Sequence, residues 1–149
     1  MGILRELLEK EVKRLIKKHK TNNPFEIAKA ENIMIFREPL GEINGYYNKY
    51  VRQKMIHINS NLDESSFKGL FTCSHELCHA KFHPDSNTPF LRNNTLFSVN
   101  KLEVQANTFA AFMTIPKNIL LGYNGFTLQQ VACAEGIPVQ ALKLRFNWF

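Results

Sequence analysis

The chain has 149 residues and a formal net charge of +6, with 44% hydrophobic and 21% charged residues. This length suits one domain with its own core, and the composition is typical of a soluble globular protein, not a disordered one. No apolar run approaches the roughly 20 residues that span a bilayer, and the charged N-terminus does not resemble a secretory signal. Three cysteines without a Cys-x-x-Cys pair also fit a reducing compartment, so we expect a cytoplasmic protein.

The first 20 residues are expected to form an amphipathic helix with a basic outer face. Seven Lys or Arg residues against three Glu residues give this segment a charge of +4, and its apolar residues recur at helical spacing. Such a face can attract nucleic acid, an acidic protein or an anionic lipid, but a solvated face is the simpler interpretation. Asn23 and Pro24 then predict the start of a second, short helix.

Strand patterns follow. Alternation from Asn32 to Glu38 predicts one strand, and "GYYNKYVRQKMIHIN" predicts a hairpin with strands at 46–50 and 54–59. A long helix, capped by Asn61 or Asp63, is expected to run through "FKGLFTCSHELCHAKFH" to Pro84. The result is a small antiparallel sheet packed on a long helix.

The second half of the chain reads as helical. Residues 85–100 are polar and predict a loop, "KLEVQANTFAAFM" predicts a helix ended by Pro116, and the tail from Thr127 holds two short helical patterns. No linker divides the chain. We therefore predict a single α+β domain over residues 1–149, made of a basic helix (1–23), a core (24–121) and a helical tail (122–149).

The stretch "HELCHAKFHP" carries the chemistry. His75 and His79 are four residues apart, so on a helix both imidazoles leave the same face and can bind one zinc ion. Glu76 is rotated by about 100° around the helix axis, which places it beside the ion, where it can accept a proton from an attacking water. The pattern also arises by chance, but the preceding hairpin adds an edge strand for an extended substrate. A metal site is favoured over a purely structural helix.

Three residues compete for the position of third ligand. His83 lies about 12 Å along a straight helix from His75, too far for a shared ion. Asp85 lies ten residues beyond His75, where some zinc proteases place a ligand after a glycine that turns the chain. In this sequence Phe82 stands at the position of that glycine. Glu103 lies on a separate predicted helix whose alanines allow close packing, and this favours it. Asn107, one turn later, would then hydrogen-bond a ligand histidine and orient it.

These motifs carry a family resemblance. "HELCHAKFH" followed by "EVQANTFAAFMTIP", with the upstream "GYY…IHIN" hairpin, resembles the ImmA/IrrE family of zinc metallopeptidases over about residues 24–121. The resemblance implies a zincin-like core, one zinc ion bound by His75, His79 and Glu103 in a gluzincin-like set, and Glu76 as general base. It also implies a protein substrate, since members often accompany phage-like repressors and relieve repression by cleaving them. Cys78 and Gln105 depart from the family's usual Gly and Glu.

The tail "VACAEGIPVQALKLRF" resembles a helix-turn-helix. If this segment bound DNA, five side chains would face the DNA groove: Pro138, Val139, Gln140, Lys143 and Leu144. Only Gln140 and Lys143 can hydrogen-bond base edges, which is a poor set. We therefore expect the two helices to pack on the core or to dock a partner, and we do not expect DNA binding.

Two function classes remain. One is a zinc endopeptidase that cleaves a regulatory protein, a helix-turn-helix repressor according to the resemblance. The other is a DNA-binding or partner-binding regulator with a non-catalytic metal site. A structural zinc site needs four protein ligands and no base, whereas this sequence offers three ligands and the carboxylate of Glu76. The sequence therefore favours the endopeptidase.

Overall fold

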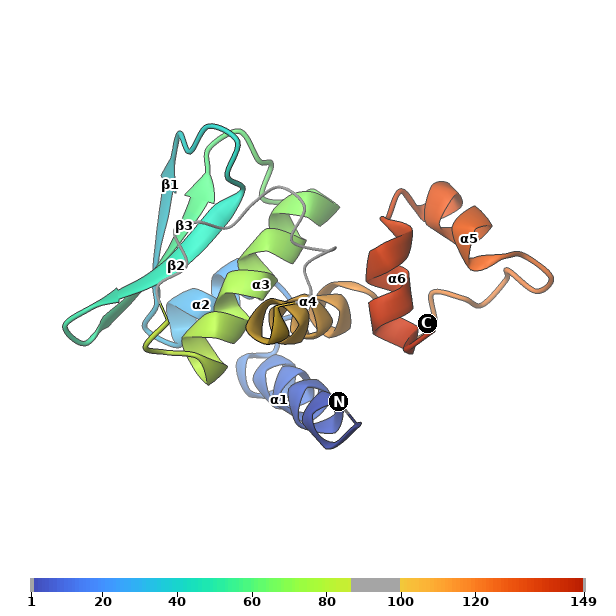
Figure 1. Cartoon of the computed structure of the whole chain (residues 1–149), viewed down its shortest axis with the longest axis horizontal. Helices are drawn as coiled ribbons and strands as arrows, with labels where there is room; N and C mark the ends of the chain where they lie inside the picture. The colour runs from blue at the N-terminus through green and yellow to red at the C-terminus, as the bar shows by residue number, and fades with distance from the viewer. Residues whose placement is uncertain (1, 87–99, 149) are drawn as a thin grey trace.

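The computed structural model describes residues 2–86 and 100–148, so the predicted loop at 85–100 lies almost wholly outside the described part. Within these ranges, two helices are followed by three strands and then by four helices (Figure 1). Their bounds are α1 Gly2–His19, α2 Pro24–Ala30, β1 Met34–Glu38, β2 Gly45–Tyr50, β3 Gln53–Asn59, α3 Phe67–Phe82, α4 Lys101–Thr114, α5 Leu128–Glu135 and α6 Val139–Phe146. The predicted α+β class is confirmed.

The three strands form one mixed sheet in the order β1-β3-β2. The hairpin β2–β3 is antiparallel as expected, but β1 pairs with β3 in parallel, so the prediction of a wholly antiparallel sheet was wrong. The reason lies in the connection from β1 to β2, which crosses over the end of β3. Asn59 holds this connection, because its side-chain amide donates to the carbonyls of Gly41 and Ile43 at 2.8 and 2.9 Å. Alternation identifies strands but does not identify their partners.

Helix α3 begins later than predicted. The hydroxyl of Ser66 accepts a hydrogen bond from the backbone of Gly69 and caps the helix, whereas Asp63 closes a turn on Ser65. The helix ends at Phe82, and His83 leaves the helical conformation before Pro84. Most of the helix is buried, including Cys73 and Cys78.

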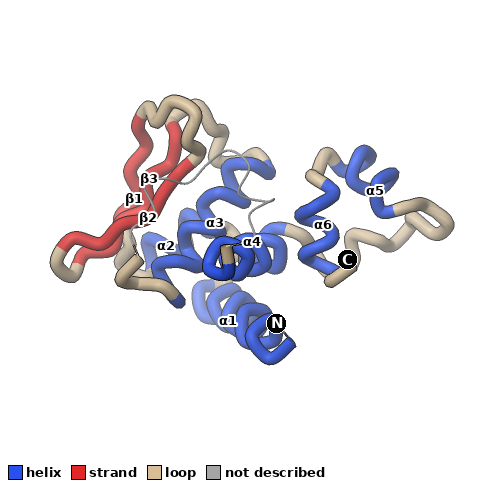
Figure 2. The backbone as a smooth tube through the Cα atoms, in the orientation of Figure 1, coloured by secondary structure: helices blue, strands red, loops and turns tan. Residues whose placement is uncertain are grey.

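The sheet packs against α3, and β2 forms the edge strand next to it. Gly45 permits this approach, because an added Cβ would lie 2.7 Å from the carbonyl oxygen of His57 and 2.9 Å from Cγ2 of Thr72. Figure 2 shows all three strands gathered on one side of the molecule, with helices making up the rest. The hairpin is thus held beside the helix that carries the histidines.

Helix α4 packs on α3 and links two hydrophobic clusters. One cluster joins α1, α2, the sheet and α3; the other joins α4 to the tail helices. The fully buried Ala106 and Ala110 lie on α4, where small side chains allow close helix packing. Figure 1 shows α3 and α4 between the sheet on one side and the α5–α6 pair on the other.

The tail helices pack on each other, and α6 packs on α4 of the core. Helix α5 has a capping box at Thr127 and Gln130 and ends at Glu135, before Gly136, whose φ of +69° suits glycine. Helix α6 packs on α4, and Arg5 of α1 donates to the carbonyl oxygens of Leu144 and Arg145 at 2.5 and 2.6 Å. Leu144 is buried, so part of the face that would read DNA is already covered.

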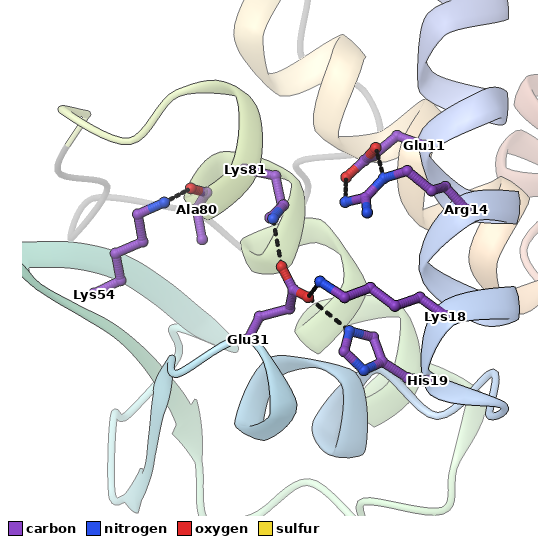
Figure 3. A network of polar contacts seen from close by, with 8 residues as sticks. All are labelled: Glu11, Arg14, Lys18, His19, Glu31, Lys54, Ala80 and Lys81. Atoms are coloured by element: carbon purple, nitrogen blue, oxygen red, sulfur yellow. Dashed lines mark hydrogen bonds and ion pairs between the residues drawn. The ribbon is translucent and has the colours of Figure 1, made fainter.

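An ion-pair network joins α1, α2 and the end of α3 (Figure 3). The carboxylate of Glu31 contacts Lys81 at 2.5 Å, His19 at 2.6 Å and Lys18 at 3.0 Å. Lys54 of β3 donates to the carbonyl oxygen of Ala80 at 2.6 Å, which satisfies a free carbonyl of the last helical turn. This network fixes the C-terminal end of α3. None of the helices in the described ranges is long and apolar enough to cross a membrane.

Candidate metal centre

Three potential ligand atoms converge between α3 and α4. His75 and His79 lie one turn apart on α3, and their rings are 5.0 Å apart between centroids. Oε2 of Glu103, from α4, lies 2.6 Å from Nε2 of His75 and 3.2 Å from Nε2 of His79. The candidate ligand atoms of the three residues lie within 4.8 Å of one another.

Glu103 reaches this position because of how α4 begins. The side chain of Asn100 accepts hydrogen bonds from the backbone of Leu102 and Glu103, so the carboxylate stands in the first helical turn. The buried Ala106 one turn later keeps α4 close to α3. The structure thus brings Glu103 together with the two histidines, and its role as a ligand stays a prediction.

The surroundings of Glu103 favour its ionised form. Burial alone would raise the pKa of Glu103, but the neighbouring imidazoles of His75 and His79 outweigh it and lower that pKa to about 2. Glu103 is therefore ionised at neutral pH, as a carboxylate ligand must be. Burial is also the largest influence on both histidines, yet the carboxylates around His75 raise its pKa, whereas the pKa of His79 is lowered.

The donor atoms fit a divalent metal ion. Nε2 of His75 is buried and has no hydrogen-bond partner among the described residues, although the carboxylate of Glu103 lies beside it. A buried nitrogen without such a partner is costly unless something else binds it. Two imidazole nitrogens and one carboxylate oxygen form the donor set of catalytic sites that keep an open position.

The opposite nitrogens of the two rings are held by other side chains. Nδ1 of His75 lies 2.7 Å from Oδ1 of Asn107, and Nδ1 of His79 lies 3.0 Å from Nδ1 of His83. Both Nε2 atoms are thereby directed toward Glu103. Glu76 is also buried, and its Oε2 lies 4.0 Å from Nε2 of His75, beside the three converging atoms.

Comparison with known proteins places this chain in a peptidase family. The sequence profile of the IrrE N-terminal-like domain, Peptidase_M78, matches residues 28–145, which is most of the chain. The chain belongs to this peptidase family. The M78 match covers α3, α4 and both tail helices, so it includes every residue of the candidate metal centre.

Two relatives are similar over most of their lengths. One is "Uncharacterized immunity region protein 2" of Bacillus phage phi105, which is 45% identical over 142 residues, 93% of this chain and 89% of the relative. The other is "Metallopeptidase ImmA" of Bacillus subtilis (strain 168), which is 34% identical over 137 residues, 88% of this chain and 79% of the relative. The expected resemblance to the ImmA/IrrE family is confirmed.

The other two candidates for third ligand do not share the position of Glu103 in this M78 domain. Asp85 is exposed, and its Oδ1 pairs with Nζ of Lys49 at 2.6 Å. His83 contacts His79 on the nitrogen that faces away from Glu103. Neither joins the cluster formed by His75, His79 and Glu103.

Sequence reasoning missed the environment of His83. Its Nε2 lies 2.8 Å from Oε1 of Gln105, which had been noted only as a departure from the family pattern. The four-residue spacing from His79 to His83 was a signal for contact between the two rings. The contact of His83 with Gln105 was not predicted from the sequence.

Proposed function

We propose that this chain is a zinc-dependent endopeptidase of the M78 family that cleaves a helix-turn-helix repressor and so relieves repression. The observation that carries the proposal is the convergence of His75, His79 and Glu103 with the carboxylate of Glu76 beside them. The kinship with a named metallopeptidase and with a protein of a phage immunity region supports a regulatory protein as substrate. Such a substrate would place the activity in the cytoplasm.

His75, His79 and Glu103 would hold one zinc ion, which when bound supplies a Lewis acid for the substrate carbonyl. Glu76 takes a proton from the attacking water and returns it to the amine that leaves as the C–N bond breaks. Its burial next to His75 holds the carboxylate near the reacting atoms. Asn107 accepts a hydrogen bond from Nδ1 of His75, which keeps the Nε2 lone pair of that ring available.

The substrate would bind as an extended strand. Strand β2 is an edge of the sheet and lies against α3, so one side of its backbone has no strand partner among the described residues. A peptide that pairs with this edge is bound through its main chain, and side-chain pockets then provide selectivity. In a domain of this size, further selectivity would come from docking on the basic α1 or the α5–α6 pair.

The alternative, a regulator with a non-catalytic metal site, has less support. A structural zinc site has four protein ligands, whereas the described residues bring together three. The buried Leu144 further reduces the face available for DNA. Glu76 distinguishes the two functions, because an endopeptidase needs a general base beside its metal ligands and a non-catalytic metal site does not.

The test is co-expression with a repressor from the same immunity region, followed by mass spectrometry of the fragments. We expect cleavage at few sites with the unaltered chain and none with Glu76→Gln, which keeps the side-chain shape but cannot accept the proton. If the zinc-loaded protein cleaves no neighbouring repressor, the substrate proposal is wrong. If the zinc-loaded protein cleaves no protein or peptide at all, the endopeptidase proposal is wrong and the regulator with a non-catalytic metal site replaces it.

A further inference from the structure

Helix α3 ends in a way that turns His83 back onto the candidate metal centre. The residue before a proline avoids the helical conformation, and His83, which precedes Pro84, adopts φ −131° and ψ 53°. Its backbone amide still bonds to the carbonyl of His79 at 2.8 Å. Nδ1 of its ring thereby comes within 3.0 Å of Nδ1 of His79.

This turn is anchored from the sheet. The hydroxyl of the buried Tyr47, on β2, donates to the carbonyl oxygen of Pro84 at 2.6 Å. The other nitrogen of His83, Nε2, lies 2.8 Å from Oε1 of the buried Gln105 on α4. His83 is thus held between α3, the sheet and α4.

Two Nδ1 atoms at hydrogen-bond distance need a donor on one ring and an acceptor on the other. The amide oxygen of Gln105 can only accept, so Nε2 of His83 carries the proton and Nδ1 of His83 is the acceptor. Nδ1 of His79 must then donate, which leaves a lone pair on its Nε2, the atom that faces Glu103. The reverse direction would put the proton on Nε2 of His79, where it would prevent metal binding.

We propose that His83 and Gln105 are positioning residues that fix the tautomer and orientation of His79 through the hydrogen-bond chain Gln105–His83–His79. This inference rests on the proposed function, because it takes His79 to bind the metal through Nε2. It gives His79 the support that Asn107 gives His75. His83 is therefore neither a ligand nor a simple end cap of α3.

Two variants of equal shape test this chain of hydrogen bonds. His83→Asn places an amide oxygen near the position of Nδ1 and retains an acceptor, whereas His83→Leu fills the same space without one. Zinc affinity is measured by competition with a chromogenic chelator. His83→Leu should bind zinc about 10–100-fold more weakly, as is usual when a residue that orients a ligand is removed. His83→Asn should stay close to the unaltered protein.

A second measurement needs no variant. Nitrogen-15 NMR of the histidine rings in the zinc-loaded protein should show His83 protonated on Nε2 and not on Nδ1. A proton on Nδ1 of His83, equal weakening by Asn and Leu, or unchanged affinity in His83→Leu would each overturn the proposal. If the unaltered protein binds no zinc, the proposed function itself fails, and that result is distinct from these three.

Discussion

Oδ1 of Asn107 lies 2.7 Å from Nδ1 of His75, and both side chains are almost fully buried. The two residues belong to different helices, so this hydrogen bond also joins α4 to α3 at the candidate metal centre. It leaves Nε2 of His75 facing the carboxylate of Glu103. The packing of α4 on α3 therefore also sets the orientation of the His75 ring, which is a proposed ligand.

Asn107→Leu should weaken zinc binding by about 10–100-fold, because it removes the acceptor of His75 while keeping the side chain's size. It also leaves a buried N–H without a partner, at a cost of about 1–3 kcal/mol in the free energy of unfolding. Chelator competition and urea unfolding measure the two effects. Unchanged zinc affinity in a folded Asn107→Leu protein would show that His75 is oriented by other contacts.

Removal of Glu103 should abolish stoichiometric zinc binding. Glu103→Ala leaves two histidines and no carboxylate in the cluster, which is too few protein ligands for a stable site. Asp85→Ala is the control, since Asp85 is exposed and pairs with Lys49. Elemental analysis after gel filtration should find one zinc per chain in the control and in His83→Ala after saturation. Zinc retained by Glu103→Ala and lost from Asp85→Ala would move the third ligand.

The long helix, the strands and the proposed ligands were predictable from local patterns. The spacing of His-Glu-x-x-His puts both histidines on one face of a single helix. Glu103 was favoured as third ligand because the alanines near it predict a close contact between two helices. The parallel pairing of β1 was not predictable, because it depends on the crossing held by Asn59. The contact of His83 with Gln105 depends on where α3 stops and how α4 crosses it.

Glu31 should contribute to stability above its unfolded pKa and lose that contribution in acid. Burial would raise its pKa, but Lys81, His19 and Lys18 lower it from 4.5 to about 2, a difference worth about 3 kcal/mol at pH 7. The depressed folded-state pKa means that this stabilisation declines as the pH falls from about 4.5 toward 2. Figure 3 shows the carboxylate of Glu31 in contact with Lys81, His19 and Lys18.

Glu31→Gln should therefore lower the free energy of unfolding more at pH 7 than at pH 3. Urea unfolding of zinc-free protein at both values measures this, and zinc-free conditions remove the effect of metal release. Glu64→Gln is a suitable control, because its ion pair with Arg37 is more exposed. An equal decrease in the free energy of unfolding of Glu31→Gln at the two pH values would show that the ionisation of Glu31 does not stabilise the fold.

Exposed aromatic residues at the tail should matter for a folded repressor and not for a short peptide. Phe126 and Trp148 are 56% and 53% exposed, so their replacement by Ser leaves the core intact. Truncation after Gly125 would instead remove buried residues of α5 and α6, including Leu142. We expect the double variant to cleave repressor more slowly and an unstructured peptide at the normal rate. An unchanged ratio of the two rates would exclude docking through these side chains.

The most direct test of the central claim is the cleavage rate of Glu76→Gln at full zinc occupancy. The amide keeps the shape of the side chain but cannot accept a proton, so the rate should fall by about 10²–10⁴-fold. Zinc content and the thermal unfolding midpoint should stay close to those of the unaltered protein. A fully loaded Glu76→Gln protein that cleaves at the normal rate would contradict the claim that Glu76 is the general base of this site.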